Sequence, residues 1–345
     1  ADVIIGLYYE LAGVRGRRGV EVVKMRGSAP LPGRHGLSLD ETGAVVYPRL
    51  EARVADSPRR GPRSAFGDGA HDVSSRPVPT NVQGRASFGL PELDALLDGG
   101  LTSGTSTLLT GSIGVGKTLL ALNFALEGVR RNEPTLFLGF RETAEQLLSK
   151  ADAFAVGAQL RAGLRRGGLT LLRWEPVELD ADVVGHHLIA ALDRTHARRL
   201  VIDSIAEMEH AVVECSGADR VPNFMAALLA ALRARGVTLL ALREAPKAVT
   251  QYLEISTDAL SVLAENVLHL QEVTVRNEVR RVLTVVKMRF SAFDRTLREF
   301  RIAPPDSFTV VGPVETGADV LLEVAQQYGF TAGLRHETPD SGRTG

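Results

Sequence analysis

The stretch 106–118, with the sequence S-T-L-L-T-G-S-I-G-V-G-K-T, joins a short apolar run to a glycine-rich turn. Its residues 111–118 fit the pattern G-x-x-x-x-G-K-[ST], which is typical of a loop that binds phosphate groups. A strand before the turn and an amphipathic helix over 117–130 after it give the context that this pattern requires. The stretch therefore predicts a strand, a phosphate-binding loop and a helix, in that order.

The loop residues have the chemistry that a nucleoside triphosphate and its metal need. Glycines allow backbone N–H groups to turn toward phosphate oxygens, and the positive end of the helix dipole favours the same anion. Lys117 is expected to reach the β- and γ-phosphates, and the Thr118 hydroxyl is expected to bind Mg²⁺. A turn without a ligand is the alternative, and the flanking strand and helix argue against it. The predicted ATP contacts from the loop are Gly111, Ser112, Gly114, Gly116, Lys117 and Thr118.

Apolar runs and helical patterns alternate along the rest of the chain. Strands are predicted at 135–140, 169–174, 200–204 and 237–242, and helices at 143–153, 181–192 and 221–234. This alternation is typical of an α/β fold with a mostly parallel sheet flanked by helices. Two more strands, at 266–273 and 279–288, predict a C-terminal antiparallel hairpin that closes the sheet.

One carboxylate has the position of a metal-site residue. Residues 199–204 read R-L-V-I-D-S, so Asp203 ends a buried apolar strand. Behind a phosphate loop, an acid at this place holds a water molecule bound to the metal. Asp also caps a following helix well, and the two roles are compatible. Lys117 and Asp203 are therefore predicted as catalytic residues, with Thr118 and Asp203 at the Mg²⁺.

The composition narrows the class of protein. The chain has 345 residues, with 40 Lys plus Arg, 41 Asp plus Glu and a net charge of −1, which argues against a broad surface for nucleic acid. The single cysteine, Cys215, excludes a disulfide framework and a cysteine-based zinc module. The apolar runs of the chain are too short to span a bilayer, and no signal-peptide pattern opens the sequence. A soluble cytoplasmic protein is the expectation.

One segment occurs twice. Residues 21–28 read E-V-V-K-M-R-G-S and residues 284–291 read T-V-V-K-M-R-F-S, which places Lys24 and Lys287 263 positions apart. A match of this length suggests two copies of one domain. We therefore expect a C-terminal remnant of a first domain at 1–54, a flexible linker at 55–84, a complete second domain at 85–312, and a C-terminal helix and disordered tail at 313–345. The phosphate loop of the first copy would precede Ala1.

The repeated segment carries paired cations. Lys287 and Arg289 stand two positions apart on a strand and should share one face. Two cations on one face suggest an anionic partner, whereas a solvated edge strand, where lysine is common, is the alternative. The second occurrence, at Lys24 and Arg26, favours a functional role.

Several segments together resemble the KaiC family, the hexameric ATPases and autokinases of the bacterial circadian clock and their non-clock relatives. The segments are 88–94 (F-G-L-P-E-L-D), 98–101 (D-G-G-L), 111–118, 141–143, 200–204, 266–270 and the two Lys-Met-Arg strands. The resemblance covers 85–312 as a whole domain and 1–54 as the end of a preceding one. The phosphate loop alone is shared with many ATPases, and its combination with the other segments is specific.

The resemblance implies a RecA-like phosphate-loop NTPase domain that forms a homo-oligomeric ring, a hexamer, with ATP between neighbouring subunits. Lys287 and Arg289 would reach the γ-phosphate from the adjacent subunit, as an arginine finger does. Arg281, Met288, Ser291 and Asp294 match positions that line the same nucleotide in the family. ATP binding and ring assembly would then depend on each other.

Two neighbouring residues raise the question of catalytic competence. In RecA-type ATPases a Glu at this strand end polarises the nucleophile, and Glu142 is the carboxylate available there. Alternatively, Glu142 lies in the first turn of the next helix and complements its dipole. The family usually has two adjacent glutamates at this point, and the first is its usual general base. Here Arg141 takes that place and cannot accept a proton at neutral pH, so hydrolysis or phosphotransfer is expected to be weak or lost.

The clock members of the family also phosphorylate a Ser-Thr pair of their own. Counting back 26 residues from Lys287 gives Ser261 and Val262, so one hydroxyl of the pair is present. Ser256 and Thr257 are nearby alternatives, and an ordinary surface serine is an equally weighted interpretation of Ser261.

Three functions compete on this sequence. The first is an Mg-ATP-dependent KaiC-like ATPase that could extend to serine/threonine autophosphorylation and act in signalling through protein partners. The second is a ring that binds ATP with little turnover and serves as a scaffold, which Arg141 favours. The third, a RecA-like DNA-repair ATPase, is disfavoured by the near-zero net charge and by the Lys-Met-Arg strand.

Overall fold

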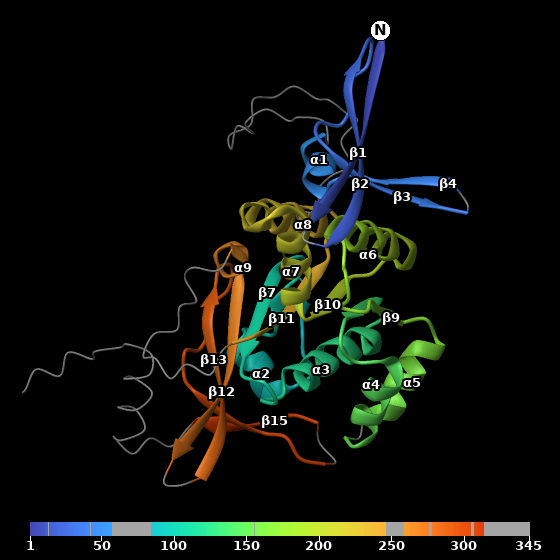
Figure 1. Ribbon diagram of the computed structural model, residues 1–345. Coiled ribbons are helices and arrows are strands. Elements are labelled where there is room, and N and C mark those ends of the chain that lie inside the picture. The colour runs from blue at the N-terminus through green and yellow to red at the C-terminus, as the bar shows by residue number, and fades with distance from the viewer. Residues whose placement is uncertain are drawn as a thin grey trace, which may run out of the picture.

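The computed structural model describes residues 1–12, 14–41, 43–56, 84–154, 156–245, 259–275, 278–304 and 307–313. A nine-stranded sheet forms the centre of the molecule, and helices lie on both of its faces (Figure 1). A separate four-stranded sheet, built from the N-terminal residues, stands beyond one of these helical layers.

The central sheet is parallel over most of its width. From one edge to the other, its strands are β15 (Thr309–Pro313), β14 (Arg298–Arg301), β13 (Glu278–Met288), β12 (Asn266–Val275), β7 (Ser106–Gly111), β11 (Thr238–Glu244), β10 (Arg199–Asp203), β8 (Thr135–Gly139) and β9 (Leu169–Arg173). The strands from β12 to β9 pair in parallel, whereas β12 and β13 form an antiparallel hairpin that β14 and β15 extend. The predicted α/β class, with its parallel sheet and C-terminal antiparallel hairpin, is confirmed.

Two apolar cores lie on the two faces of this sheet, because successive residues of each strand point to opposite sides. Leu108 of β7 packs into one core and its neighbour Leu109 into the other. The helices that border these cores are α2 (Pro91–Leu96), α3 (Lys117–Arg130), α4 (Ala144–Asp152), α5 (Gly157–Arg165), α6 (Ala181–Thr195), α7 (Ile205–Ser216), α8 (Val221–Ala234) and the short α9 (Ala259–Leu263). Both faces of the sheet are therefore buried, which explains why its strands are apolar throughout.

Several elements of the structure were not predicted. They include the helices α1 (Leu50–Asp56), α2, α5, α7 and α9, a short 3-10 helix at Ala218–Arg220, the strands β14 and β15, and the small sheet of β5 (Arg85–Ala86) and β6 (Leu101–Thr102). Helix α1 contains residues 55 and 56, so the prediction that a linker begins at residue 55 is wrong at that boundary. Two long segments lie outside the described residues. The first, 57–83, is the predicted linker without residues 55, 56 and 84. The second, 314–345, carries the predicted C-terminal helix and tail.

The N-terminal sheet repeats the antiparallel part of the central sheet. Its strands, in spatial order, are β1 (Val3–Ala12), β2 (Arg15–Met25), β3 (His35–Asp40) and β4 (Gly43–Tyr47). Adding 263 to the bounds of β1 and β2 gives the bounds of β12 and β13. The order β1-β2-β3-β4 also matches β12-β13-β14-β15.

The two hairpins share an irregularity as well as their bounds. In the first, Ile4 pairs with Lys24 and the register then shifts, so that Ile5 pairs with Val22. In the second, Val267 pairs with Lys287, and the same shift brings Leu268 opposite Val285. A shift of this kind bends and twists the strand that carries the extra residue. The sequence repeat is therefore also a repeat of backbone geometry.

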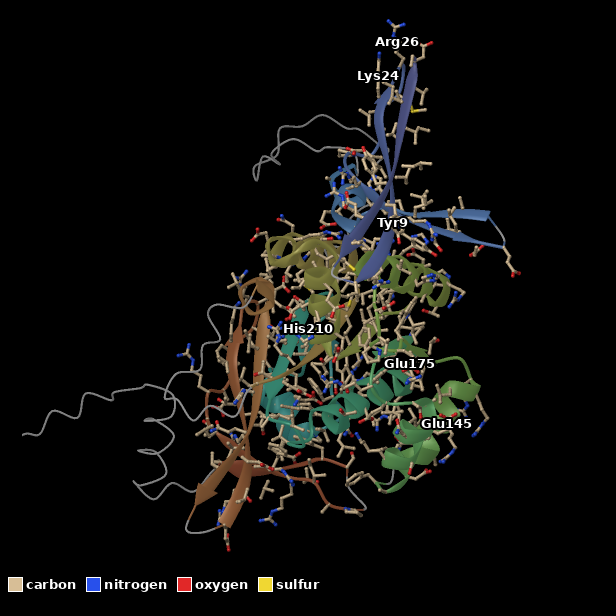
Figure 2. All side chains as sticks on the ribbon, viewed as in Figure 1. Tyr9, Lys24, Arg26, Glu145, Glu175 and His210 are labelled. Carbon is tan, nitrogen blue, oxygen red and sulfur yellow. The ribbon has the colours of Figure 1, made fainter. Side chains whose placement is uncertain are left out.

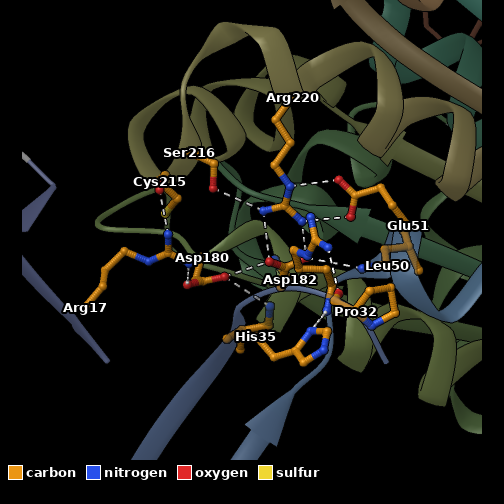
Figure 3. Close-up of polar contacts among 12 residues, drawn as sticks. Arg17, Pro32, His35, Leu50, Glu51, Asp180, Asp182, Cys215, Ser216 and Arg220 are labelled. Carbon is orange, nitrogen blue, oxygen red and sulfur yellow. Dashed lines mark hydrogen bonds and ion pairs between the residues drawn. The ribbon is translucent and has the colours of Figure 1, made fainter. Parts of the chain in front are cut away.

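A cluster of ion pairs holds the N-terminal unit against the main body (Figure 3). The guanidinium of Arg220, just before α8, contacts Glu51 of α1 at 2.8 Å and Asp182 of α6 at 2.6 Å. Arg17 of β2 contacts Asp180, the N-cap of α6, at 2.9 Å. Although burial opposes its charge, hydrogen bonds to Glu51 and Asp182 raise the pKa of Arg220. Two carboxylates from separate units therefore share one buried cation.

The described helices are too short or too polar to cross a lipid bilayer.

Candidate functional site

The phosphate loop lies between β7 and α3, as predicted. Gly116 caps α3 with φ of 114°, in the left-handed region, and a Cβ there would overlap the side chain of Ile302. The ammonium of Lys117 turns back over the loop and donates to the carbonyls of Gly111 and Ser112, each at 2.8 Å. The loop is thus folded around its own lysine, and glycine is required where the backbone turns.

A hydroxyl and a carboxylate meet at the base of this loop. The Thr118 hydroxyl, in the first turn of α3, donates to Oδ2 of Asp203 at the end of β10, at 2.8 Å. Burial raises the pKa of Asp203, and the hydrogen bond from Thr118 offsets part of that effect. Burial likewise lowers the pKa of Lys117, against the charges of Glu244 and Asp203. The structure therefore brings together the three residues that the sequence predicted, although Thr118 and Asp203 are 85 positions apart in the chain.

These residues fit the needs of Mg²⁺ bound together with phosphates. Among the described residues, no group of three or more His, Cys, Asp or Glu side chains could hold a metal by itself. Mg²⁺ rarely needs such a cage, because it keeps several waters and takes one or two protein oxygens plus substrate phosphates. The half-buried pair of Thr118 and Asp203 offers oxygens of that kind beside the loop.

A cavity of about 650 Å³ opens from the loop. Its polar end contains Lys117, Thr118 and Asp203. Apolar side chains form another part of the lining, and they include Phe137, Leu147, Phe154, Leu171 and Leu172. A site with a charged end and an apolar end suits a nucleotide, whose base is flat and less polar than its phosphates. The sequence analysis missed this apolar wall, because its members are scattered along the chain and look like ordinary core residues.

Glu142 lies on the wall of the cavity, before the following helix rather than in it. Thr143 is the N-cap of α4, and its side chain forms a capping box with Gln146. The acid in the first turn is Glu145, so the interpretation of Glu142 as a first-turn residue is wrong. The carboxylate of Glu142 is paired with Lys150, and its charge contributes to the raised pKa of Asp203. Glu142 therefore lies near Asp203, and one of its carboxylate oxygens is paired with a lysine.

Arg141 is held by two carboxylates that the sequence analysis did not single out. Its guanidinium contacts Glu207 of α7 at 2.8 Å and Glu244 at the end of β11 at 3.0 Å. The hydrogen bond to Glu207 is the largest cause that raises the pKa of Arg141. Glu244 could have been suspected, because it follows the apolar strand predicted at 237–242, much as Asp203 ends another apolar strand.

Most residues matched to the family's nucleotide contacts lie away from the cavity of their own chain. Of that group, Arg281 lines the cavity, and it also contacts Glu272 at 3.4 Å. The side chain of Met288 is buried in the core. Asp294 accepts hydrogen bonds from Thr296, and its backbone N–H donates to the carbonyl of Leu96. The hydroxyl of Ser291 donates to the carbonyl of the adjacent Ala292. Within one chain, the described part of the cavity therefore gathers the loop residues and Arg281 but not this second group.

Lys287 and Arg289 both reach the end of α9, but only Lys287 lies on β13, because the strand ends at Met288 and Arg289 follows it. Lys287 donates to the carbonyl of Ala264 at 2.7 Å, and Arg289 donates to the carbonyl of Val262 at 3.4 Å. Both acceptors belong to the C-terminal end of α9 or follow it directly. Their counterparts Lys24 and Arg26 lie at the open end of the first hairpin, beside the start of β1 and far from the central sheet (Figure 2).

The phosphoacceptor candidates are placed only in part. Ser261 belongs to α9, the helix whose end receives Lys287 and Arg289. Ser256 and Thr257 lie outside the described residues.

Comparison with known proteins agrees with this site. A family model described as the KaiC ATPase matches residues 86–315. The circadian clock oscillator protein KaiC of Picosynechococcus is 25% identical over 352 residues, which cover 95% of this chain and 58% of that protein. The KaiC protein of Synechococcus elongatus is 24% identical, over 99% of this chain and 62% of its own length. That of Prochlorococcus marinus (strain MIT 9313) is 25% identical, over 92% of this chain and 59% of its own length.

The chain thus spans about three fifths of the length of these relatives. The family match contains the phosphate loop, Asp203 and the Lys-Met-Arg strand, and so covers the RecA-like phosphate-loop domain described above. On this match, the chain belongs to the KaiC ATPase family.

Proposed function

We propose that this chain binds Mg-ATP at the phosphate loop and hydrolyses it slowly as a KaiC-type ATPase. The observation that carries the proposal is the hydrogen bond from Thr118 to Asp203 beneath a loop that already encloses Lys117. The 650 Å³ cavity with an apolar wall provides room for the base and ribose. RecA-like repair of DNA has no comparable support, because the chain carries no excess of positive charge.

The residues of the site have separable tasks. Backbone N–H groups of the loop and the start of α3 would bind the phosphates, and Lys117 would exchange its carbonyl partners for phosphate oxygens. Thr118 and Asp203 would hold Mg²⁺, directly and through water. When bound, the ion neutralises charge that develops on the phosphates. Glu142 is the proposed acceptor of the proton of the attacking water, provided that it leaves Lys150.

The test is nucleotide binding and phosphate release by the unchanged chain and by Lys117→Ala. The loss of the charge that reaches the phosphates should abolish both activities. Lys24→Ala is the matched control, because Lys24 is an exposed lysine at the open end of the first hairpin, and its loss should change neither activity. Equal phosphate release by the unchanged chain and Lys117→Ala would refute the proposal.

A specific observation favours a second candidate, an ATP-binding scaffold with almost no turnover. Arg141 replaces the family's usual general base and is held by Glu207 and Glu244. Arg141→Glu should then raise the rate of phosphate release sharply, while the unchanged chain shows binding without release. A fast rate in the unchanged chain would exclude the scaffold.

We also propose a ring of identical subunits, as in the KaiC resemblance, with Lys287 and Arg289 reaching the ATP of the neighbouring subunit. Their distance from the cavity of their own chain and their shared position at the end of α9 support a contact in trans. Mass measurement in solution should show a hexamer with Mg-ATP and smaller species without it. Lys287→Ala together with Arg289→Ala should prevent assembly, and assembly that survives both changes would contradict the trans contact.

The strand repeat supports a further proposal, that residues 1–54 form the closing segment of a first KaiC-type domain. In the second copy β7 pairs with the edge of β12, and the described part of the chain places no strand on the matching edge of β1. Amide exchange should therefore be faster in β1 than in β12. Equal protection of the two strands would contradict this assignment.

Autophosphorylation at Ser261 is proposed only as an extension of ATPase activity. Incubation with Mg-ATP followed by mass spectrometry should add one phosphate to the unchanged chain and none to Ser261→Ala or Lys117→Ala. A phosphate on Ser256 or Thr257 instead would move the acceptor, and no phosphate on any residue would remove the kinase proposal.

A further inference from the structure

Arg141 reaches the mouth of the nucleotide cavity from the end of β8. Gly139 of β8 pairs with Asp203 in the sheet, and Arg141 follows Gly139 by two residues along the chain. The side chain of Arg141 is 59% exposed, whereas that of its partner Glu207 is 11% exposed. The charged head is therefore anchored to a buried carboxylate on one side and accessible from the cavity on the other.

The partners of Arg141 connect it to the phosphate loop. Glu244, which contacts Arg141 at 3.0 Å, pairs in register with Gly111, the first residue of the loop. The charge of Glu244 acts on Lys117, and the charge of Asp203 acts on Arg141. Arg141, Glu244, Asp203 and Lys117 thus share one electrostatic field, and a change of charge on any of them affects the others.

Arg141 decides the net charge of the cavity wall. Among the described residues that line it, the cations are Lys117, Arg141, Lys150, Arg173 and Arg281, and the carboxylates are Glu142, Asp203 and Glu244. The wall is therefore positive by two charges, which favours a polyanion. A glutamate in place of Arg141, which is the usual residue of the family at this position, would make the wall neutral.

We propose that Arg141 binds the terminal phosphate of ATP from within the same subunit, leaving its contact with Glu244 when the triphosphate enters. This inference rests on the proposed function, because it requires a nucleotide in the cavity. A guanidinium presents two parallel N–H groups to two phosphate oxygens, which a lysine cannot do. Glu207 and Glu244 keep this fork at the cavity, and the γ-phosphate offers it a partner of higher charge than either carboxylate.

The proposal separates ATP from ADP, and this difference provides the test. Calorimetric binding of the β,γ-imido analogue of ATP and of ADP, both with Mg²⁺, should be measured for the unchanged chain and for Arg141→Gln. The loss of a charge-assisted contact should weaken binding of the ATP analogue on the order of tenfold and change ADP binding less than about twofold. Arg141→Lys, which keeps the charge but not the fork, should show an intermediate loss.

Arg173→Gln is the matched control. Arg173 lines the same cavity and pairs with an exposed carboxylate, so this change removes the same charge from another wall. It should alter the affinities of the two nucleotides by the same factor. Equal changes for ATP analogue and ADP in Arg141→Gln, or no change in either, would overturn the role of Arg141 while leaving the proposed ATPase intact. Failure of the unchanged chain to bind either nucleotide would instead refute the proposed function, and the role of Arg141 with it.

Discussion

His269 shows how a single buried side chain couples the phosphate-loop strand to the closing hairpin. It lies on β12, and its Nδ1 is 2.8 Å from the hydroxyl of Thr110, the residue just before the loop. Burial, aided by the charge of Lys117, lowers the pKa of His269 to about 4. The imidazole is therefore neutral at physiological pH and acts through its hydrogen bond rather than its charge.

This shifted pKa predicts a pH-dependent loss of stability. Between about pH 6.5 and pH 4 the unfolded chain binds a proton at His269 that the folded chain does not, so the free energy of unfolding falls as the pH falls through this window. The contribution amounts to about 3 kcal/mol. Urea unfolding at several pH values should show this slope in the unchanged chain and not in His269→Gln. His210→Gln, at an exposed histidine on α7, should keep the slope, and a slope that persists in His269→Gln would contradict the assignment.

At the scale of residues, the sequence predicts the motif but not its surroundings. The eight residues of the loop lie together in the chain, so their spacing alone identifies them. Arg141 meets Glu207 and Glu244 from 66 and 103 positions away, and only the fold brings these charges together. Their contact depends on which strands are neighbours in the sheet, and no local pattern records that order.

At the scale of elements, Thr143 fixes where α4 begins and therefore where Arg141 and Glu142 stand. Its side chain accepts a hydrogen bond from the backbone of Gln146, whose side chain in turn accepts one from the backbone of Thr143. Removal of such a cap costs about 1 kcal/mol. Thr143→Ala should lower the free energy of unfolding in urea by this amount.

Thr195→Ala is the control for the cap. The hydroxyl of Thr195 donates to the carbonyl of Ala191 within α6, so its loss removes a hydrogen bond without leaving a helix end uncapped. It should change stability by less than about 0.5 kcal/mol. Equal losses in the two variants would show that Thr143 has no capping role.

Strong periodicity explains which elements were predicted. The strands of the parallel sheet are apolar on both faces, and the long helices α3, α6 and α8 carry broad apolar stripes, so both appear clearly in the sequence. Helix α7 begins at Ile205, with only its N-cap Ser204 after the last residue of β10, so no loop separates the two elements in the sequence. Strands β14 and β15 have four and five residues, too few for an alternation to be recognised.

At the scale of the whole molecule, Arg220 joins the N-terminal unit to the second domain. Asp182, one of its two partners, is 2% exposed, and Arg220 itself is 12% exposed. Arg220→Met would leave a buried carboxylate without its cation, which typically costs about 3–5 kcal/mol. We expect unfolding at lower urea concentration and faster amide exchange in α1 and β3.

Arg235→Met provides the comparison. Arg235 pairs with Asp193, which is 57% exposed, and exposed pairs of this kind contribute less than about 1 kcal/mol. If Arg220→Met and Arg235→Met change stability and exchange equally, the cluster in Figure 3 does not hold the two units together.

The carbonyls that receive Lys287 and Arg289 have a mechanical consequence. They are neutral acceptors at the end of a short helix, so a phosphate presented by another molecule would win the competition for both cations. When both cations move to the phosphate, the end of α9 loses the two hydrogen bonds that they donate to it. In the proposed ring, a nucleotide bound to one subunit would thereby loosen α9 of the neighbouring subunit. Binding at one site would then affect the next subunit without a change in the core of either.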